Sequence, residues 1–411
     1  MSERGTFPKA TVRDAELDGQ RALVRVDFNV PLSDGAVADD TRIRAAMPTI
    51  DLIRDRGAAA TLVSHLGRPE GRDPALSMAP VARRLGELLS VDVPLAPGVV
   101  GEEVERQTRG LGPGGVMLLE NSRFEPGETA NDPELAKALA RLADLYVNDA
   151  FGAAHRAHAT TEGVAHHLPA YAGLLLEREV RELTAVRDDP ARPLVVVLGG
   201  AKVSDKLGVI ERFLETADRI LIGGAMCFSF FEANGVGVGD SLVEEQGIEL
   251  ARQVLREAES SDCELWLPHD LVIGDRFGAD AERRELDATG VPDGWMGLDI
   301  GPQSAAEYAG AITDAGTVFW NGPMGAFELE PFAAGTRAVA DAVAGSKAFT
   351  VVGGGDSVAA LVAFGLADRV DWLSTGGGAS LELMEGRALP GVEALLDSDR
   401  LPVAGAGAPD G

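Results

Sequence analysis

The stretch LVVVLGGAKVSDKLGVI, residues 194–210, contains the structural unit from which most of this chain is built. Its first five residues form a continuous apolar run, which is typical of a strand buried on both faces. Two glycines and an amphipathic segment follow, so the stretch predicts a strand, a tight turn and a helix. The turn holds Lys202 and Lys206, although the whole chain has only five lysines. Two lysines in one turn indicate a binding site.

The same pattern recurs along the chain. Ten apolar or β-branched runs predict buried strands: RALVRVDF, AATLVSH, GVMLLE, DLYVND, PLVVVLGG, RILIGG, ELWLPH, TVFWNG, FTVVGG and WLSTGG. Amphipathic segments such as APVARRLGELLS and VIERFLETA separate them. This alternation predicts an α/β fold with parallel sheets flanked by helices, and ligands at the carboxyl ends of the strands.

The length of 411 residues favours two lobes over a single hydrophobic core. The helical segment LLLEREVRELTAV and the linker RDDPARP interrupt the pattern near the middle. The sequence therefore predicts four parts: an N-terminal lobe over 1–173, a hinge helix and linker over 174–192, a C-terminal lobe over 193–396 and a flexible tail over 397–411.

The composition is 45% hydrophobic and 25% charged, which is typical of a globular protein. No apolar run approaches the roughly 20 residues that span a bilayer. The two cysteines form no CxxC pair and the first residues lack the apolar core of a signal peptide, so we expect a cytoplasmic protein without membrane contact. The net charge of −28 argues against nucleic-acid binding and is typical of proteins adapted to high salt.

Three turns in the second half resemble phosphate sites: GGAKVSDK, VVGGGDSVAALVAF and STGGGASLELMEG. In each, glycines allow backbone amides to approach a ligand at a helix N-terminus, where anions are favoured. We expect Ser204 or Asp205 to cap the first helix, and Asp356 offers a carboxylate for Mg²⁺. Any one such turn can also be simple tight packing. Three of them favour a shared polyphosphate.

Two other nucleotide signatures are absent from the sequence. There is no GxxxxGK[ST], so the chain is not a P-loop protein, and GVGVG at 235–239 does not fit a dinucleotide fingerprint. WNGPMGAFELE, residues 320–330, offers an amide, a rigid turn and Glu328 for an adenine or a ribose. The alternative is an ordinary loop.

The first half carries a different set of polar residues, nearly all directly after predicted strands: Asp27, Asn29, Arg42, His65, Arg68, Arg123 and Arg156. A single arginine usually makes a solvated ion pair. Several converging on strand ends suit a phosphate and a carboxylate, which guanidinium groups bind with two parallel hydrogen bonds. His155 and His158 of HRAH could form a metal pair, but no third ligand is near and Arg156 opposes a cation.

Taken in order, the motifs RVDFNVP, SHLGRP, LLENSRF, VNDAFGAAHRAH, GGAKVSDK, WMGLDIGP, WNGPMGAFE, GGGDS and STGGGASLE resemble those of the phosphoglycerate kinase family over nearly the whole chain. The resemblance implies two Rossmann-like lobes joined by a hinge. It also implies reversible phosphoryl transfer between 1,3-bisphosphoglycerate and ADP, giving 3-phosphoglycerate and MgATP. We expect a monomer with these small molecules as its partners and Mg²⁺, carried with ATP or ADP, as its cofactor.

The resemblance also assigns residues by motif. The 3-phosphoglycerate side comprises Asp27, Phe28, Asn29, Arg42, His65, Leu66, Gly67, Arg68, Arg123 and Arg156. The nucleotide side comprises Gly200, Ala201, Lys202, Lys206, Gly297, Asn321, Glu328, Gly354, Gly355, Asp356 and Ser357, with Asp356 as the Mg²⁺ ligand. The expected catalytic groups are Arg42, Lys202, Gly355 and Gly378. Three positions depart from the family pattern: Ser357, Met324 and Ala153.

Two alternatives remain at the level of sequence. A different kinase without a P-loop would keep the glycine-rich half but has no need of SHLGRP and its arginines. A silent nucleotide-binding scaffold is favoured by loss of Arg42, Lys202 or Asp356, and all three are present.

Overall fold

The computed structural model describes residues 7–400, and the chain divides into two compact units. Residues 7–181 and 388–400 form the N-terminal unit, and residues 182–387 form the C-terminal unit. The chain leaves the N-terminal unit and enters the C-terminal unit within helix α5 (Leu174–Asp188), which lies inside the segment predicted as a hinge. Among the described residues, no helix is long and apolar enough to cross a membrane.

The N-terminal unit is built on a parallel five-stranded sheet with the order β5-β4-β1-β6-β7. Central strand β1 pairs with β4 and β6, so that Leu23 lies opposite Thr61 and Tyr146. The strands are β1 (Arg21–Arg25), β4 (Ala59–Val63), β5 (Val116–Leu118), β6 (Leu145–Asn148) and β7 (Ala170–Ala172), and a separate hairpin consists of β2 (Leu32–Ser33) and β3 (Ala36–Val37).

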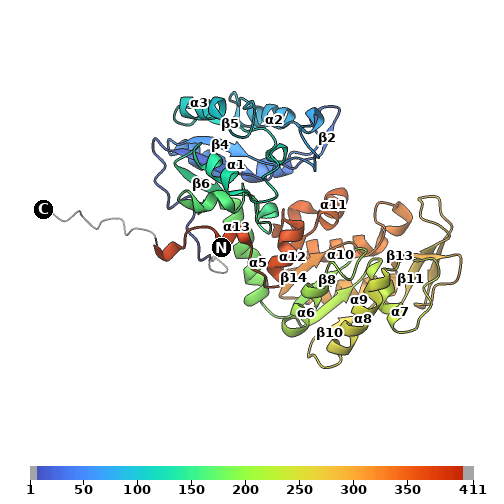
Figure 1. Ribbon diagram of the computed structural model, residues 1–411. Coiled ribbons are helices and arrows are strands. Elements are labelled where there is room, and N and C mark those ends of the chain that lie inside the picture. The colour runs from blue at the N-terminus through green and yellow to red at the C-terminus, as the bar shows by residue number, and fades with distance from the viewer. Residues whose placement is uncertain (1–6, 401–411) are drawn as a thin grey trace. The chain divides into compact units, whose positions relative to one another are not determined.

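Helices flank this sheet (Figure 1). Ile43 and Ile50, seven residues apart on one face of α1, pack in a single core with Leu85 of α2 and with Val24 and Leu62 of the sheet. The helices are α1 (Thr41–Asp55), α2 (Ala79–Leu89), α3 (Glu102–Gly110), α4 (Pro133–Ala140) and α13 (Pro390–Glu393), with short 3₁₀ turns at Pro74–Leu76, Ser122–Phe124, Phe151–Ala153, Gly163–His166 and Ser398–Arg400.

The C-terminal unit contains a parallel six-stranded sheet with the order β10-β9-β8-β14-β15-β16. Every residue of β8 and β14 is buried, as expected for central strands covered on both faces. The strands are β8 (Leu194–Leu198), β9 (Arg219–Ile222), β10 (Glu264–Trp266), β14 (Thr317–Asn321), β15 (Phe349–Gly353) and β16 (Trp372–Leu373).

A smaller antiparallel sheet with the order β12-β11-β13 completes this unit. It has its own core of Val272, Leu298 and Phe332. Its strands are β11 (Leu271–Gly274), β12 (Arg283–Leu286) and β13 (Met296–Ile300). The helices of the unit are α6 (Leu207–Thr216), α7 (Met226–Ala233), α8 (Glu245–Ala258), α9 (Pro302–Thr313), α10 (Ala334–Gly345), α11 (Gly355–Ala363) and α12 (Gly377–Met384), with 3₁₀ turns at Glu330–Phe332 and Ala367–Arg369.

In both parallel sheets the chain first moves outward from the central strand and then crosses to its other side. The order reverses between β1 and β6 in the N-terminal unit and between β8 and β14 in the C-terminal unit. Open α/β sheets bind ligands at the carboxyl ends of the strands beside such a reversal. The topology therefore selects the segments that follow β1, β6, β8 and β14.

The sequence predictions for strands are largely confirmed. All ten predicted strands are present, and all lie in the two parallel sheets. The sequence missed β7, the β2–β3 hairpin and the whole antiparallel sheet, because these strands are short and lack a long apolar run. Parallel sheets flanked by helices confirm the predicted fold class.

One segment differs from the predicted division. Residues 388–396 were placed in the C-terminal lobe, but they pack within the N-terminal unit. The backbone N–H of Gly391 donates to the carbonyl of Ala154, and that of Leu396 donates to Ala170. Of the predicted tail, Asp397 forms an ion pair of 2.8 Å with the buried Lys9, and residues 401–411 lie outside the described part of the chain.

Candidate functional site

The polar set of the N-terminal unit gathers at the carboxyl ends of its strands, as predicted. Asp27 and Asn29 follow β1, His65 and Arg68 follow β4, and Arg156 follows β6. These arginines are close enough to affect one another. Burial lowers the pKa of Arg123, and the positive charges of Arg156, Arg25 and Arg68 lower it further. These side chains therefore form one basic cluster in a chain that is acidic overall.

Asp27 and Asn29 organise this cluster. The guanidinium of Arg42 donates from Nη1 to Asp27 Oδ2 and to the carbonyl of Asn29, both at 3.2 Å. The side-chain oxygen of Asn29 accepts from the backbone N–H of Gly67 at 2.9 Å. Arg123 donates to the carbonyl of the same glycine. Gly67 has a φ of 62°, a conformation that favours glycine, so this loop depends on its lack of a side chain.

His65 is a neutral group surrounded by cations. Burial lowers the pKa of His65 well below its usual value, and four arginines lower it further. These are Arg25, Arg123, Arg156 and Arg42. A neutral imidazole can still donate one hydrogen bond to an anion, and it adds no charge to a crowded cationic site.

Two predicted substrate-binding residues have their contacts inside the protein. Phe28 and Leu66 are buried core side chains. The backbone N–H of Phe28 donates to Ser64 Oγ, and the N–H and carbonyl of Leu66 both bond to the Asn121 side chain. These contacts hold the strand ends in place.

The structure adds three residues that the sequence analysis missed: Arg25, Glu128 and Thr160. Arg25 is only 1% exposed and donates from Nη2 to His65 Nδ1 at 3.0 Å. It also donates from Nε to Thr160 Oγ1, which in turn donates to the buried Glu128. Of these three, Arg25 had a signal in the sequence, because it is a charged residue that directly follows the apolar residues 22–24 of β1.

The HRAH segment belongs to the basic cluster. Burial lowers the pKa of His158 to about 4, and the charges of Arg25 and Arg156 contribute. His155 accepts from Arg156 Nε at 3.0 Å. Over residues 7–400, no group of three or more His, Cys, Asp and Glu side chains is placed to hold a metal ion.

The C-terminal unit builds its site mainly from backbone. Gly200, Gly224 and Gly322 all have positive φ values, of 94°, 66° and 97°. A Cβ on Gly224 would lie 2.4 Å from the nitrogen of Gly200, and one on Gly322 would lie 2.3 Å from the carbonyl oxygen of Gly199. The loops after β8, β9 and β14 therefore touch backbone to backbone, which only glycine permits.

The two lysines of the opening stretch have different surroundings. Lys206 donates to Asn321 Oδ1 at 2.8 Å and is half-buried, and burial lowers its pKa against the opposing charges of Asp205 and Asp356. Lys202 is exposed, and no hydrogen bond from its ammonium group is found within the described chain. The structure thus contains one anchored lysine and one that is available to a ligand.

Two cavities lie over these loops. The smaller, of about 280 Å³, collects the phosphate candidates: Gly200, Ala201, Lys202, Lys206, Asn321, Gly354, Gly355, Asp356 and Ser357. The larger, of about 690 Å³, has mostly apolar walls and includes Gly297, Met324 and Glu328. The two share Gly200, Ala201 and Asp356 in their linings. A cavity lined by lysines, aspartates and glycine backbone that adjoins an apolar one fits a molecule with an anionic end and a flat apolar end.

The structure differs from the predicted nucleotide side in two details. Gly377, the first residue of α12, lines the small cavity, and Gly378 does not. Helix α6 begins at Leu207 with no side-chain cap, so the expected cap by Ser204 or Asp205 is wrong. Ser204 instead donates to Glu244, a residue 40 positions away in sequence.

Two of the three departures from the family pattern, Ser357 and Met324, make specific contacts with neighbouring loops. Ser357 Oγ accepts from the N–H of Gly322 at 2.5 Å, so the hydroxyl fixes the loop after β14. Met324 is buried, and its side chain occupies the space above Gly199 and Gly223, where a Cβ would lie 2.7 and 2.5 Å from its atoms. Ala153 is buried in the turn before HRAH.

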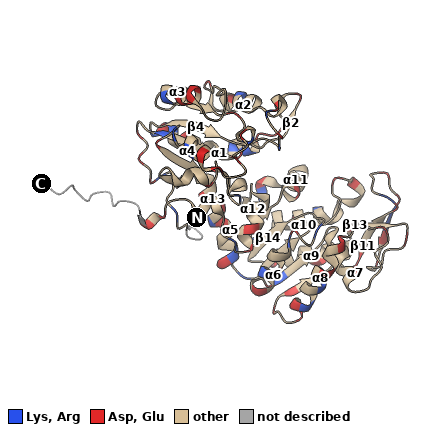
Figure 2. Cartoon of the chain, viewed as in Figure 1, with Lys and Arg blue, Asp and Glu red and all other residues tan. Residues whose placement is uncertain are grey.

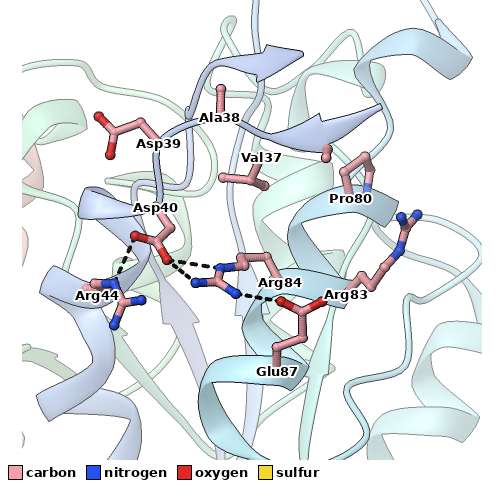
Figure 3. A pocket seen from close by; sticks show the side chains of 10 residues that line it. Val37, Ala38, Asp39, Asp40, Arg44, Pro80, Arg83, Arg84 and Glu87 are labelled. Carbon is pink, nitrogen blue, oxygen red and sulfur yellow. Dashed lines mark hydrogen bonds and ion pairs between the residues drawn. The ribbon is translucent and has the colours of Figure 1, made fainter. Parts of the chain in front are cut away.

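A third cavity, of about 500 Å³, lies in the N-terminal unit and contains none of the predicted site residues (Figure 3). Asp40 lies between Arg44 and Arg84 there, at 2.8 and 2.7 Å, and Arg84 also pairs with Glu87. These charges neutralise one another. The basic cluster, which has few carboxylates, is the better anion site.

Comparison with known proteins identifies the family of the chain. A family model described as phosphoglycerate kinase matches residues 12–387. The chain belongs to the phosphoglycerate kinase family. The predicted family and enzyme type, a phosphotransferase with a carboxyl group as acceptor, are confirmed.

Phosphoglycerate kinases with similar sequences span the same length. The chain is 55% identical over 390 residues to that of Moorella thermoacetica, covering 95% of this chain and 99% of the relative. It is 56% identical over 394 residues to that of Rubrobacter xylanophilus, covering 96% and 100%. Among solved structures, phosphoglycerate kinase from Coxiella burnetii matches with a TM-score of 0.85 and 40% identity, covering 96% of this chain and all of that one. The enzyme from Pyrococcus horikoshii matches with a TM-score of 0.83 and 34% identity, covering 94% and 98%.

Proposed function

We propose that this protein catalyses reversible phosphoryl transfer between 1,3-bisphosphoglycerate and ADP, giving 3-phosphoglycerate and ATP. The observation that carries the proposal is the small cavity of the C-terminal unit. Nine residues assigned from sequence to the nucleotide side line it, and it adjoins an apolar cavity suited to a nucleobase. The N-terminal unit supplies a separate basic cluster for the phosphate and carboxylate of the second substrate.

In the N-terminal unit we assign 3-phosphoglycerate to the guanidinium groups of Arg42, Arg68, Arg123 and Arg156, with His65 as a neutral donor. Asp27 and Asn29 act by holding Arg42 and the Gly67 loop. Guanidinium groups match the spacing of carboxylate and phosphate oxygens, so a rigid cluster binds both anionic ends of a small molecule.

In the C-terminal unit we assign the nucleotide phosphates to the small cavity and the base to the larger one, with Glu328 near the ribose. Lys206, fixed by Asn321, offers a localised charge to the phosphates. The amide groups at the start of α11 add the positive end of a helix dipole.

Asp356 is the residue we assign to Mg²⁺. Its carboxylate is exposed and lines both cavities, and a carboxylate oxygen is a ligand that Mg²⁺ prefers. Mg²⁺ usually takes one or two protein carboxylates and completes its shell with phosphate oxygens and water, so a lone aspartate suffices. When bound, the ion neutralises charge on the phosphates.

The chemistry requires alignment more than proton transfer. The acceptor carboxylate is ionised at neutral pH, so no general base is needed. We assign Arg42 and Lys202 to the phosphoryl group in transit, with amides at Gly355 and Gly378 helping, because charge neutralisation and positioning dominate such reactions. Since Arg42 and Lys202 belong to different units, we infer that the units close on their ligands through α5, which also excludes water from the acyl phosphate.

We further propose a cytoplasmic monomer that works at high salt. The net charge of −28 supports the last point, because salt screens self-repulsion. Acidic and basic residues occur together on helices such as α3 and α8 (Figure 2).

The proposed closure of the two units can be tested by solution scattering. The same radius of gyration with and without both ligands would contradict closure.

The deciding experiment is ATP-dependent phosphorylation of 3-phosphoglycerate with Mg²⁺ in molar KCl, coupled to NADH oxidation. Turnover that disappears in Lys202→Ala would support both the reaction and the role of this lysine. A folded chain without turnover would overturn the proposal, and other carboxylate acceptors would then be screened.

A further inference from the structure

A chain of buried hydrogen bonds runs through the N-terminal unit and ends at His65. Thr160 Oγ1 donates to Glu128 Oε1 at 2.6 Å, and the backbone N–H of Thr160 donates to Glu128 Oε2 at 3.0 Å. Arg25 Nε donates to Thr160 Oγ1 at 2.9 Å. Arg25 Nη2 lies 3.0 Å from His65 Nδ1. Four side chains from distant parts of the sequence are thus connected.

Every member of this chain is shielded from water. Arg25 and Glu128 are each 1% exposed, Thr160 is fully buried, and His65 is 8% exposed. Burying a guanidinium and a carboxylate is costly unless both are hydrogen-bonded. Here the Thr160 hydroxyl bridges the two charges, because it accepts from one and donates to the other. The arrangement is rigid, since breaking any bond leaves a buried polar group unpaired.

The donors and acceptors permit only one protonation pattern at the end of the chain. A carboxylate accepts only, so the Thr160 hydroxyl hydrogen faces Glu128 and its oxygen is left to accept from Arg25. A guanidinium donates only, so His65 Nδ1 must accept. The proton of a neutral His65 must therefore sit on Nε2. Within residues 7–400, Nε2 has no hydrogen-bond partner, so it is free to donate to a ligand.

We propose that Glu128, Thr160 and Arg25 are positioning residues that hold His65 in the tautomer with its proton on Nε2, so that His65 donates to an anionic oxygen of the substrate. This inference rests on the proposed function, because it takes the basic cluster as the 3-phosphoglycerate site. It deepens that assignment, since in the other tautomer a nitrogen lone pair would face the anion and repel it.

Charge in the surroundings keeps the His65 ring neutral, which the tautomer argument requires. The groups around the imidazole are the guanidinium groups of Arg25, Arg42, Arg123 and Arg156, and each disfavours a second proton on the ring. A proton on Nδ1 would also remove the lone pair that accepts from Arg25. The ring stays neutral and its orientation stays fixed.

The first test is direct and needs no activity. Nitrogen-15 NMR of the intact protein distinguishes a protonated ring nitrogen from one with a lone pair, and His65→Gln identifies the signal among the six histidines. We expect Nε2 to carry the proton and Nδ1 to be bare from about pH 6 to 8. A proton on Nδ1, or a mixture of tautomers, would overturn the proposal even if the enzyme is active.

The second test uses a matched pair at one position. Thr160→Val keeps the shape but removes the hydroxyl, and Thr160→Ser keeps the hydroxyl. In Thr160→Val we expect mixed His65 tautomers and a KM for 3-phosphoglycerate raised about tenfold, the effect of one lost charge-assisted hydrogen bond, with the KM for ATP unchanged. Thr160→Ser should restore both readouts. Equal KM values in folded Val and Ser variants would contradict the proposal.

Glu128→Gln provides an independent variant if Thr160→Val does not fold. Its amide presents a donor as well as an acceptor, so one oxygen that accepts from Thr160 is replaced by a group that cannot. We expect the same mixed tautomers and raised KM. An unchanged His65 spectrum would show that Glu128 has no part in the positioning. If the natural chain did not phosphorylate 3-phosphoglycerate at all, the proposed function would fail while the NMR result stood by itself.

Discussion

The candidate sites of the two units are built by opposite means. The N-terminal unit uses charged side chains, and a buried polar network around Arg25, His65 and Glu128 holds them. The C-terminal unit uses bare backbone, with glycine loops in contact and only two lysines nearby. The difference suits the proposed ligands: a small molecule with a carboxylate and a phosphate requires directional donors, whereas a nucleotide requires close approach along its phosphates and an apolar cavity for its base.

The largest effect should come from the exposed lysine of the C-terminal unit. Lys202→Ala should lower kcat by roughly 10² to 10³, or about 3–4 kcal/mol, if the ammonium acts in the transition state. Lys206→Ala should chiefly raise the KM for ATP, because Lys206 is already fixed to Asn321. The coupled assay measures both. If Lys202→Ala kept full kcat, the assignment of Lys202 to the phosphoryl group would be wrong.

The backbone character of the C-terminal site can be broken at one glycine. Gly224→Ala should reduce the free energy of unfolding by about 2–4 kcal/mol, since its Cβ would lie 2.4 Å from the Gly200 nitrogen and its φ is 66°. Nucleotide affinity should fall with it, because the loops after β8 and β9 must separate. Urea unfolding and ATP titration measure the two effects.

The control for this glycine is Gly310 on helix α9. Gly310 is exposed and a Cβ there meets nothing within 4 Å. Gly310→Ala should raise the free energy of unfolding by about 0.5–1 kcal/mol through helix propensity. Equal effects at both positions would contradict the close-approach argument.

Asp149 in the N-terminal unit and Asp299 in the C-terminal unit are both buried, and they allow a direct comparison. Burial raises the pKa of Asp149 to about 7, against about 3.9 in an unfolded chain. The folded state then binds more protons between these values, so the free energy of unfolding should fall as pH rises from about 4 to 7. Asp149→Asn keeps an acceptor for the N–H groups of Leu175 and Leu176 and should make this slope shallower. Urea unfolding at several pH values measures the slope.

Asp299 in the C-terminal unit should behave differently, although burial also raises its pKa to about 7. Its two oxygens accept from the N–H groups of Ile300 and Gly335, at 3.0 and 2.7 Å. In Asp299→Asn the new amide would face an N–H donor, so we expect a loss of about 1–3 kcal/mol at every pH. By contrast, Oδ2 of Asp149 has no partner in the described chain. Identical pH profiles for the two variants would remove this distinction.

The smallest effect concerns the acidic surface, which the two units share. Raising KCl from low to molar concentration should move the unfolding midpoint upward, by an amount on the order of 1 kcal/mol in unfolding free energy, because salt screens repulsion among carboxylates. Urea unfolding followed by circular dichroism measures it. Superimposable curves at the two salt concentrations would refute the proposal that the chain is adapted to high salt.

Sequence alone predicted the parallel sheets well. A buried central strand must be apolar throughout, so runs such as LVVVL and AATLV were recognised from local pattern. The glycine turns and the arginines after strands were also predicted, because the carboxyl ends of parallel strands gather at one edge. Short antiparallel strands such as β12 carry no comparable signal, since three of its four residues are exposed.

The supporting groups around each site were decided only by tertiary structure. Arg25 and Thr160 are 135 residues apart and Ser204 and Glu244 are 40 apart, so no local pattern joins them. The same holds for residues 388–400, which return to the N-terminal unit. The sequence by itself predicted which polar residues lie at the strand ends and turns where the ligands are proposed to bind. Only the fold decided which buried partners orient them, because that depends on which distant groups meet in the absence of water.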